Sequence, residues 1–497
     1  MALDTSATAS SPLPTYLQAA KPNPPSNRAP WYKNTAPTYA GIFLWFVFWD
    51  QIAYNGQLNK GGLAMALTGV LLAGLICHFL FYLVPGLLGM KTGLPLYIVG
   101  SSTFGSIGGL LMPGFLMGLL QFGWLAVNTY YAASFLAEEA LKAFGGNSDV
   151  YFYVLCVAWA ATAAFIGLKG IQYVAKVATF LPLIPLAVLV LALVKFAPSA
   201  GSYYVARSGH NWDFFAPIWA MLSMVAAIVG FFATAGAAGV DFGMNSKDAA
   251  DVNRGGLVGI FLAILLTAGG AVIAVAGAHV TRALPNLQTH QLVEERMRQQ
   301  GKNPSDPSNL SEIMQAERKE DLTLTNALKS EKAGLPPWLV SAMMIGLTLA
   351  AFPGACFSSF IAANSFKTVM PQVNSFLSVG LGALVSILLA VTRVAGDLGA
   401  VFGFIGASFG PICGAMCADY LLAGRRWAGP RAGFNPAGWA AWALGFLVGI
   451  LPNFQIDVPA APVVAFVVGA VVYFVLAKAG LESKILPYGP AQQPQVS

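Results

Sequence analysis

Apolar stretches long enough to cross a lipid bilayer recur along this chain from Thr38 to Ala477. A helix needs roughly 20 mostly apolar residues to span a hydrocarbon core about 30 Å thick. Only 10% of the residues are charged, against about 25% in soluble domains. The sequence therefore predicts an all-α membrane protein embedded in a lipid bilayer. Its net charge of +6 is better explained by loops that face an anionic leaflet than by a nucleic-acid partner.

Hydropathy predicts twelve transmembrane helices. They are expected at residues 38–58, 64–88, 105–136, 151–169, 173–197, 214–238, 255–279, 337–365, 374–393, 396–423, 437–454 and 460–479. A polar insertion at residues 281–335 separates the seventh from the eighth. Its mixed charges predict a solvated surface segment outside the bilayer, with one or two helices of its own. Residues 1–37, rich in Pro, Ser, Thr and Ala, are expected to form a disordered tail, and residues 480–497 a second tail.

The distribution of lysine and arginine predicts the orientation of the chain. If the amino terminus is cytoplasmic, fourteen of these residues fall on inner segments and five in short outer loops. We therefore expect a multi-pass protein of the cell membrane (inner or plasma membrane) with both termini in the cytoplasm and residues 281–335 outside. Residues 1–37 have no apolar core of the signal-peptide type, so the first spanning helix is expected to direct insertion.

The five cysteines all lie in apolar stretches. Cys413 and Cys417 are one helical turn apart, but no histidine or acid joins them at the spacing of metal ligands. We therefore interpret them as small residues that pack against a neighbouring helix, and we expect no metal site and no disulfide framework.

Spans one and six carry interruptions. The first runs from large apolar residues into "DQIAYNG", residues 50–56, and the sixth contains "GFFATAGAAGVDFG", residues 230–243. Glycine weakens a helix through its backbone entropy, so we expect both helices to break there. Two broken helices five spans apart are typical of secondary transporters with inverted repeats, in which substrate and ions satisfy the freed backbone groups.

Three stretches carry motifs that resemble one known family. They are "KTGLPLYIVGSSTFGSIGGLLMPGFLMGLLQFGWLAVN" (Lys91 to Asn128), the Gly230 to Gly243 stretch quoted above, and "GPICGAMCADYLLAGRR" (Gly410 to Arg426). In this order and spacing they are similar to the nucleobase:cation symporter-1 family, which includes cytosine permeases, hydantoin transporters and fungal uracil and allantoin permeases. The resemblance extends from about Thr38 to Gly449.

The resemblance implies an amino-acid-transporter-like fold of two inverted five-helix repeats followed by two peripheral helices. The first repeat would occupy residues 38–197, the second residues 214–423 with the insertion inside it, and the peripheral helices residues 437–479. No cofactor is expected beyond the coupling ion, and a monomer is compatible with this fold.

The resemblance also implies a substrate held between two aromatic faces. The tryptophan of the family's Q-x-G-W motif is Trp124, and the aromatic residue of the broken sixth helix is Phe232. A planar heterocycle stacked on both gains about 0.5–1.5 kcal/mol per face beyond its buried area. The polar atoms of its ring then need hydrogen-bond partners. The candidates are Gln51, Gln121, Asn128, Thr234 and Ser358.

Span eight departs from the family pattern, which has a Ser/Thr pair that completes a sodium site. Counting back from Pro371 puts Phe352 and Pro353 at those hydroxyl positions, and Ser358 at the family's substrate-contacting asparagine. A looser register would make Ser358 and Ser359 the ion ligands. We prefer the first register because it needs no gap, and the coupling ion, sodium or a proton, stays open.

Asp50 is an ionisable residue inside a spanning helix, which makes it a functional candidate by default. It could carry a coupling proton in place of sodium, or it could pair with a cationic group of the substrate. Asp241 and Asp419 fall toward the cytoplasmic ends of their spans, where pairing with loop arginines is the expected role.

We conclude from the sequence that the chain imports a nucleobase or related small heterocycle, such as cytosine, uracil, a purine, hydantoin or allantoin, by cation-coupled secondary active transport. The alternative is a proton-coupled carrier of an amine or amino-acid-like substrate with Asp50 as its counter-ion. A membrane enzyme is disfavoured because the sequence has no HExxH motif, no paired buried acids at catalytic spacing and only 4 histidines. Nothing in the sequence requires a sensor.

Overall fold

Helices are the regular elements of this molecule. The computed structural model describes residues 13–169, 180–203, 215–284 and 322–488, together with Gln172, Met297, Arg298, Gly301 and Asn303. In this part of the chain, nine helical segments are long and apolar enough to cross a membrane, and α20 (Ser375–Val391) and α22 (Pro436–Gly449) are shorter apolar helices. The predicted all-α class of membrane protein is confirmed at this level.

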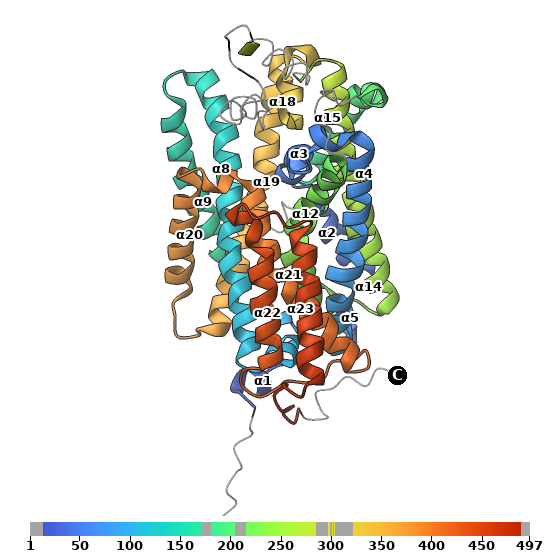
Figure 1. The fold of residues 1–497 in the computed structure, drawn as a ribbon. Helices are drawn as coiled ribbons and strands as arrows, with labels where there is room; N and C mark the ends of the chain where they lie inside the picture. Colours follow the sequence, from blue (N-terminus) through green and yellow to red (C-terminus); the bar gives the residue numbers. More distant parts are fainter. Residues whose placement is uncertain are drawn as a thin grey trace, which may run out of the picture.

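The long helices run along one axis of the molecule (Figure 1). In chain order they are α4 (Leu58–Ile76), continued by a π-helical turn into α5 (Leu83–Thr92), α8 (Leu116–Phe144), α9 (Ser148–Lys169), α11 (Leu183–Phe196), α12 (Ala216–Ala237), α14 (Ala249–Gly256), continued by two π-helical stretches into α15 (Gly270–Val280), α19 (Pro337–Val369), α21 (Leu398–Leu422) and α23 (Ala461–Lys478). Short helices α6 (Leu96–Val99) and α7 (Ser101–Phe104) precede α8.

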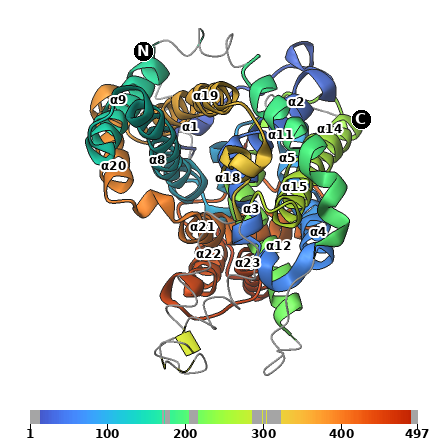
Figure 2. The ribbon, with the colours of Figure 1, turned by 90° about the horizontal axis from the view of Figure 1, so that it is seen from above.

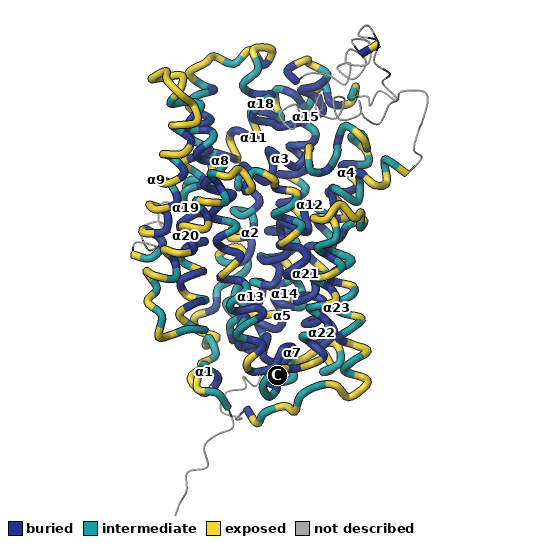
Figure 3. Tube along the Cα trace, turned by 60° about the vertical axis from the view of Figure 1, so that its left-hand side comes forward, coloured by how far each residue is buried: buried dark blue, intermediate teal, exposed yellow. Residues whose placement is uncertain are grey.

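The outer surface of the bundle is apolar, as lipid contact requires. Along α20, side chains such as Leu377, Leu381, Leu384 and Leu388 are more than half exposed. By contrast, α21 and α12 are mostly buried at the centre (Figure 3). Because exposed leucines line an outer helix while the core is dense, the molecule is arranged for a bilayer and not for water.

The first span is broken, but not where the sequence predicted. It consists of α2 (Thr35–Phe43) and α3 (Phe46–Asn55), which meet at Leu44 and Trp45. Trp45 has extended backbone angles, φ −58° and ψ 118°, and the indole of Trp49 donates a hydrogen bond of 3.2 Å to the freed Leu44 carbonyl. The expected break at residues 50–56 is therefore wrong: Asp50 to Asn55 is helical, and the chain bends among its aromatic residues instead.

The sixth span is broken as expected. α12 ends at Ala237 and α13 (Gly239–Gly243) begins two residues later. Glycine lets α13 approach α5 closely: a Cβ atom on Gly243 would lie 2.1 Å from the Gly86 carbonyl oxygen, and one on Gly89 would lie 2.0 Å from that of Val240. Small residues at helix contacts in membranes permit this kind of backbone approach. The second half of span six is thus held on span two.

Both ends of the described chain lie at one end of the bundle (Figure 1). Residues 13–37, expected to belong to a disordered tail, include α1 (Thr15–Gln18) and make specific contacts. The side chain of Asn23 donates 2.8 Å to that of Asn245, and the guanidinium of Arg28 donates 2.8 Å to the Met90 carbonyl. This part of the tail is ordered because it satisfies backbone groups of the loops that it crosses.

Part of the polar insertion lies inside the bundle at the opposite end. Helix α18 (Leu324–Lys329) packs on α3, α15 and α19, and it lies near the middle of the molecule when seen along the bundle axis (Figure 2). Leu324, Ala327 and Leu328 are completely buried. The predicted solvated character therefore does not hold for this stretch. Most of residues 285–321 lie outside the described part of the chain.

Candidate functional site

Four aromatic rings from different helices meet beside the break in the first span. Trp45 at the break, Trp124 of α8, Phe231 of α12 and Phe402 of α21 form this group, which we call the aromatic cluster. The centroid of the Trp124 ring lies 5.2 Å from that of Phe231, 5.8 Å from that of Phe402 and 5.9 Å from that of Trp45. Both tryptophans are only half-buried, although they lie among spanning helices. The cluster therefore offers apolar ring surface close to the freed backbone of span one.

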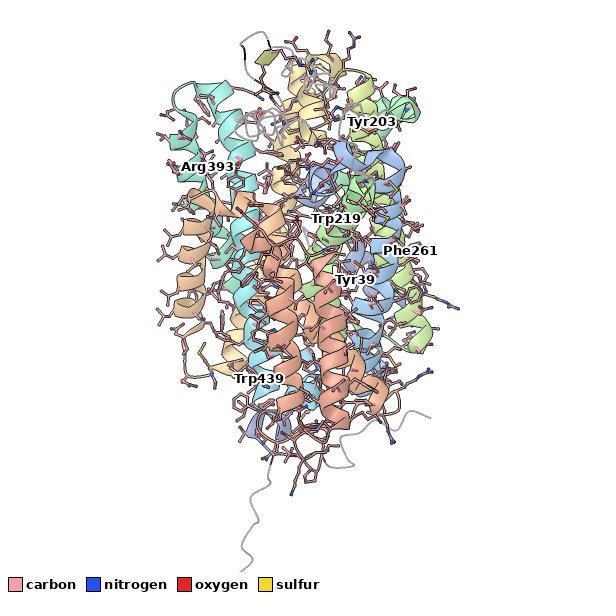
Figure 4. All side chains as sticks on the ribbon, in the orientation of Figure 1. Tyr39, Tyr203, Trp219, Phe261, Arg393 and Trp439 are labelled. Atoms are coloured by element: carbon pink, nitrogen blue, oxygen red, sulfur yellow. The ribbon has the colours of Figure 1, made fainter. Side chains whose placement is uncertain are left out.

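Phe232 faces away from Trp124. It is completely buried, its ring is stacked on Phe43 of α2 with centroids 5.7 Å apart, and it also contacts Tyr39. The Tyr39 hydroxyl donates 2.8 Å to the carbonyl of Ala235, near the end of α12 (Figure 4). The structure therefore brings Phe231, and not Phe232, next to Trp124. Sequence reasoning chose the second of two adjacent phenylalanines, and only the helix rotation distinguishes them.

Two buried polar atoms near the first span have no hydrogen-bond partner among the described residues. They are the indole N–H of Trp45 and the side-chain carbonyl oxygen of Gln51. A buried donor or acceptor without a partner costs about 1–3 kcal/mol, so such groups point to a ligand or to a second conformation. Sequence reasoning does not select Trp45, because it places the break later in the span.

Asn128 and Gln121, predicted beside Trp124, have different surroundings. The Asn128 amide donates 2.9 Å to the Ala351 carbonyl of α19 and accepts 3.0 Å from the indole of Trp159 on α9. Asn128 therefore ties three helices together. Gln121 is buried, and its amide nitrogen lies 3.7 Å from the sulfur of Met117. Since sulfur is a weak acceptor, Gln121 retains more capacity for a new partner.

The hydroxyl candidates lie on two helices. Thr234 of α12 is buried, two residues after Phe232, and Ser358 of α19 is 9% exposed. Ser359 is completely buried, and its hydroxyl donates 3.3 Å to the Ala355 carbonyl of its own helix. A Cβ atom on Gly167 of α9 would lie 2.9 Å from the Cβ of Ser359, so this serine is in the contact between α19 and α9.

The carboxylate of Asp50 is buried on α3 and bound by α18. One carboxylate oxygen accepts the backbone N–H of Thr325 at 2.7 Å. The other accepts the Thr325 hydroxyl at 3.1 Å and the Gln51 amide at 2.8 Å. Asp50 thus binds a segment of the insertion, a partner that sequence reasoning missed because the insertion looked like a solvated loop.

A second contact ties α18 to α8. The ammonium of Lys329 pairs with the carboxylate of Glu138 and lies 4.9 Å from the centre of the Phe135 ring. Phe135 in turn packs on Phe46 of α3, with ring centroids 5.0 Å apart. α18 is therefore held by the first and third spans together.

The other intramembrane acids have structural partners. Asp419 of α21 pairs with Arg431 at 3.0 Å and accepts hydrogen bonds from the hydroxyls of Ser102 and Thr103. Burial opposes the charge of Arg431, but the neighbouring Asp419 carboxylate raises its pKa above the ordinary value. Asp241 accepts the backbone N–H of Leu96 at 2.9 Å. Pairing with a loop arginine thus holds for Asp419, whereas Asp241 has a backbone partner instead.

The five cysteines are free and buried. Within the described residues, no three His, Cys, Asp or Glu side chains are grouped as metal ligands.

Comparison with known proteins identifies the family. The family model described as "permease for cytosine/purines, uracil, thiamine, allantoin" matches residues 61–476. The chain belongs to this permease family. This confirms the resemblance drawn from the three motifs, and it makes the chain a membrane permease rather than an enzyme. No curated protein sequence matches the chain.

Solved transporters share the fold of this permease. A structure of Mhp1, a nucleobase-cation-symport-1 family transporter, in a closed conformation with bromovinylhydantoin bound is 17% identical, covers 98% of each chain and has a TM-score of 0.61. The inward-facing conformation of Mhp1, also 17% identical, covers 96% of this chain and 99% of its own, with a TM-score of 0.64. A Na⁺-coupled sialic acid symporter in a substrate-bound outward-open state is 13% identical, covers 93% of this chain and 92% of its own, and has a TM-score of 0.54.

Proposed function

We propose that this permease is a secondary active symporter that imports a nucleobase or a related small, planar heterocycle together with a cation. The observation that carries the proposal is the aromatic cluster, in which a half-buried Trp124 lies beside the break in span one. Apolar ring faces beside a buried indole N–H of Trp45, which has no partner within the described residues, are what a flat molecule with polar edges requires. The bromovinylhydantoin bound by Mhp1 has this chemistry.

The proposed architecture has twelve spans in two inverted repeats. In this scheme the first repeat, expected at residues 38–197, consists of α2 to α11 and begins at Thr35, and the second, expected at residues 214–423, consists of α12 to α21. The helices α22 and α23, from Pro436 to Lys478, are peripheral, and they lie together on one side of the molecule (Figure 2). The breaks in the first helix of each proposed repeat support this division.

The proposed aromatic faces are Trp124 and Phe231. Phe231 replaces Phe232 in this role because its ring contacts Trp124 edge-on, with an interplanar angle of 90°, whereas the Phe232 ring is stacked on Phe43. A substrate would enter between rings that now touch one another. Phe402 and Trp45 would complete the walls.

Polar recognition is proposed to use the indole N–H of Trp45, which has no partner within the described residues, as a donor to a carbonyl or ring nitrogen of the substrate. Gln51, Gln121, Thr234 and Ser358 remain further candidates. Asn128 is proposed to position the helices around the site, since both ends of its amide already bind α9 and α19.

For the cation we propose a proton carried by Asp50, with Ser359 in a sodium site as the competing possibility. The Ser359 hydroxyl is bonded within its own helix, which favours Asp50. The alternative role of Asp50, counter-ion of an amine substrate, is disfavoured because its carboxylate already accepts three hydrogen bonds from Thr325 and Gln51.

We propose that the end of the molecule carrying both described ends of the chain is cytoplasmic and that α18 lies on the outside of the cell membrane. The fourteen-to-five distribution of lysine and arginine supports this orientation.

Uptake by cells that express the permease tests the proposal. The panel contains labelled cytosine, uracil, a purine, hydantoin and allantoin, with primary amines and amino acids for comparison. We expect accumulation of at least one heterocycle above that in cells with an empty vector. Accumulation of amines alone would contradict the proposal.

A further inference from the structure

A short helix of a polar loop is buried over the middle of the bundle. α18 belongs to the insertion between spans seven and eight, yet Leu324, Ala327 and Leu328 expose nothing to solvent. It contacts α3, α15 and α19 and lies near the centre of the view along the bundle axis (Figure 2). A segment in this position closes one end of any path that runs along the first span.

The contact between α18 and Asp50 depends on charge. Asp50 accepts hydrogen bonds from the backbone N–H and hydroxyl of Thr325 and from the amide of Gln51. An ionised carboxylate accepts hydrogen bonds at both oxygens, but a protonated one must donate from one of them. Since the amide N–H of Gln51 cannot accept, protonation of Asp50 breaks at least part of this arrangement.

Gln51 carries the acceptor that a protonated Asp50 requires. Its side-chain oxygen is buried without a partner within the described residues. If the amide rotates by half a turn, this oxygen accepts the proton of a neutral Asp50, and Thr325 is no longer held by a charge. The unpaired oxygen thus gives the carboxyl group an acceptor that it lacks in the ionised state.

Ionisable side chains on the elements around Asp50 include both cations and other acids. They include Lys329 of α18, Glu138 and Tyr131 of α8, His279 of α15, Lys60 of α4 and Asp397 before α21. Lys329 is already paired with Glu138, and among the described residues this is the ion pair that still joins α18 to the third span when Asp50 is neutral. The two side chains are 18% and 39% exposed, and partly solvated pairs of this kind contribute little.

We propose that Thr325 is a positioning residue for Asp50, and that α18 is an outer lid which is closed while this carboxylate is charged and released when it binds a proton. The inference rests on the proposed role of Asp50 in proton coupling. If α18 is such a lid, binding of the coupling proton to Asp50 and opening of the permease toward the outside are one event. The contacts between α3 and α18 link the two.

The first test compares the pH profile of uptake in Thr325→Val, Thr325→Ser and the unaltered permease. Valine keeps the shape and the backbone N–H of Thr325 but removes the hydroxyl, whereas serine keeps both donors. A hydrogen bond to the charged form favours that form, so its loss makes protonation easier. We expect the midpoint of the profile to move up by about one pH unit in Thr325→Val and to return in Thr325→Ser.

The matched control is Thr348→Val. Thr348 is a completely buried threonine of α19 whose hydroxyl donates 2.9 Å to the Met344 carbonyl of its own helix. Its profile is expected to match that of the unaltered permease. An unchanged profile in Thr325→Val would overturn the positioning role.

The second test measures lid opening without substrate. A cysteine introduced at Ala327, which is completely buried, is labelled on the purified protein with a polar maleimide, and the protein with its five buried native cysteines gives the baseline. Labelling of an exposed thiol at each pH corrects for the pH dependence of the reagent. The corrected labelling rate is expected to rise at least about tenfold as pH falls through the midpoint of the uptake profile. In a variant that also carries Asp50→Asn, labelling is expected to be fast at every pH. Labelling independent of pH would overturn the lid. Because no substrate is present, that failure is distinct from failure of the proposed transport function.

Discussion

At the residue scale, Trp45 at the helix break is the proposed hydrogen-bond donor to the substrate. Trp45 belongs to the aromatic cluster through its ring, which is stacked on Phe231 with centroids 6.2 Å apart. Its indole N–H is buried without a partner in the described part of the chain. Since a permease must bind its substrate only moderately, a single well-placed donor is a sufficient source of selectivity for a heterocycle with an acceptor on its edge.

Trp45→Phe separates the contribution of the aromatic ring from that of the hydrogen-bond donor, because it keeps a ring and removes the indole N–H. Loss of one net hydrogen bond of about 0.5–1.5 kcal/mol predicts a rise in the KM for uptake of about three- to tenfold, with the maximal rate largely retained. Competition uptake with unlabelled analogues checks the reason. Analogues that lack the acceptor should bind the variant and the unaltered permease alike, and a KM equal to that of the unaltered permease would rule out the donor role.

Asp50→Asn tests the coupling role directly. The amide has the shape of a protonated carboxyl group but cannot release a proton, so we expect substrate exchange to persist while accumulation against a gradient is lost. Uptake by the unaltered permease should depend on pH and tolerate replacement of sodium by choline. Sodium-dependent accumulation that survives Asp50→Asn would remove Asp50 from the coupling mechanism and return the role to a sodium site.

At the element scale, the two broken helices are supported in different ways. The break at Leu44 and Trp45 is held by aromatic packing and by the indole of Trp49. The second half of span six is held on α5 by glycines whose backbones touch. The break in span one is therefore held by side chains, whereas α13 is held on α5 through backbone contacts.

Gly243→Ala should reveal this rigid contact. The new Cβ would lie 2.1 Å from the Gly86 carbonyl oxygen, and overpacking of this kind costs about 1–3 kcal/mol. We expect a lower melting temperature of the purified protein in detergent, measured by the fluorescence of a thiol-reactive dye. The control is Gly380→Ala on α20, where a Cβ meets nothing within 4 Å. Equal melting temperatures for the two variants would contradict the close packing.

The sequence predicts where the spanning helices lie better than it predicts which side chains contact one another. Long apolar stretches define spans, so the expected ranges for α9, α20, α21 and α23 agree with the structure within about three residues. The sequence places the break in span one too late, because the packing of aromatic side chains decides the position of the break. The composition of this stretch does not reveal that packing. The same reason applies to Phe231 and Phe232, and to α18, whose few apolar residues, Leu324, Ala327 and Leu328, are buried although they stand in a polar stretch of sequence.

At the scale of the whole molecule, the two ends of the bundle are closed by different parts of the chain. Residues 13–37 cross one end through contacts such as Asn23 with Asn245, and α18 covers the other through Asp50 and Glu138. A transporter must open these ends in turn. α18 also packs Leu324, Ala327 and Leu328 into the apolar core, so opening that end exposes apolar surface as well as breaking polar contacts.

The orientation of the bundle can be measured with a protease. Added to intact cells, or to spheroplasts where an outer membrane is present, it should cut within residues 281–335 and spare both termini, as the charge distribution predicts. The cut should fall before Leu322, since Leu324 and Leu328 are buried. Fragments detected by tags on the two termini give the answer, and cleavage confined to inside-out vesicles would invert the orientation.

The central claim is that the substrate stacks on Trp124 beside the broken first helix. The most direct measurement is heterocycle uptake into proteoliposomes by Trp124→Ala, with Trp219→Ala as its control, because Trp219 lies on α12 with 40% of its surface exposed (Figure 4). We predict that Trp124→Ala loses at least about tenfold in kcat/KM, equivalent to roughly 1.4 kcal/mol, while Trp219→Ala transports normally and both proteins reconstitute to the same level. Full transport by Trp124→Ala would contradict the account.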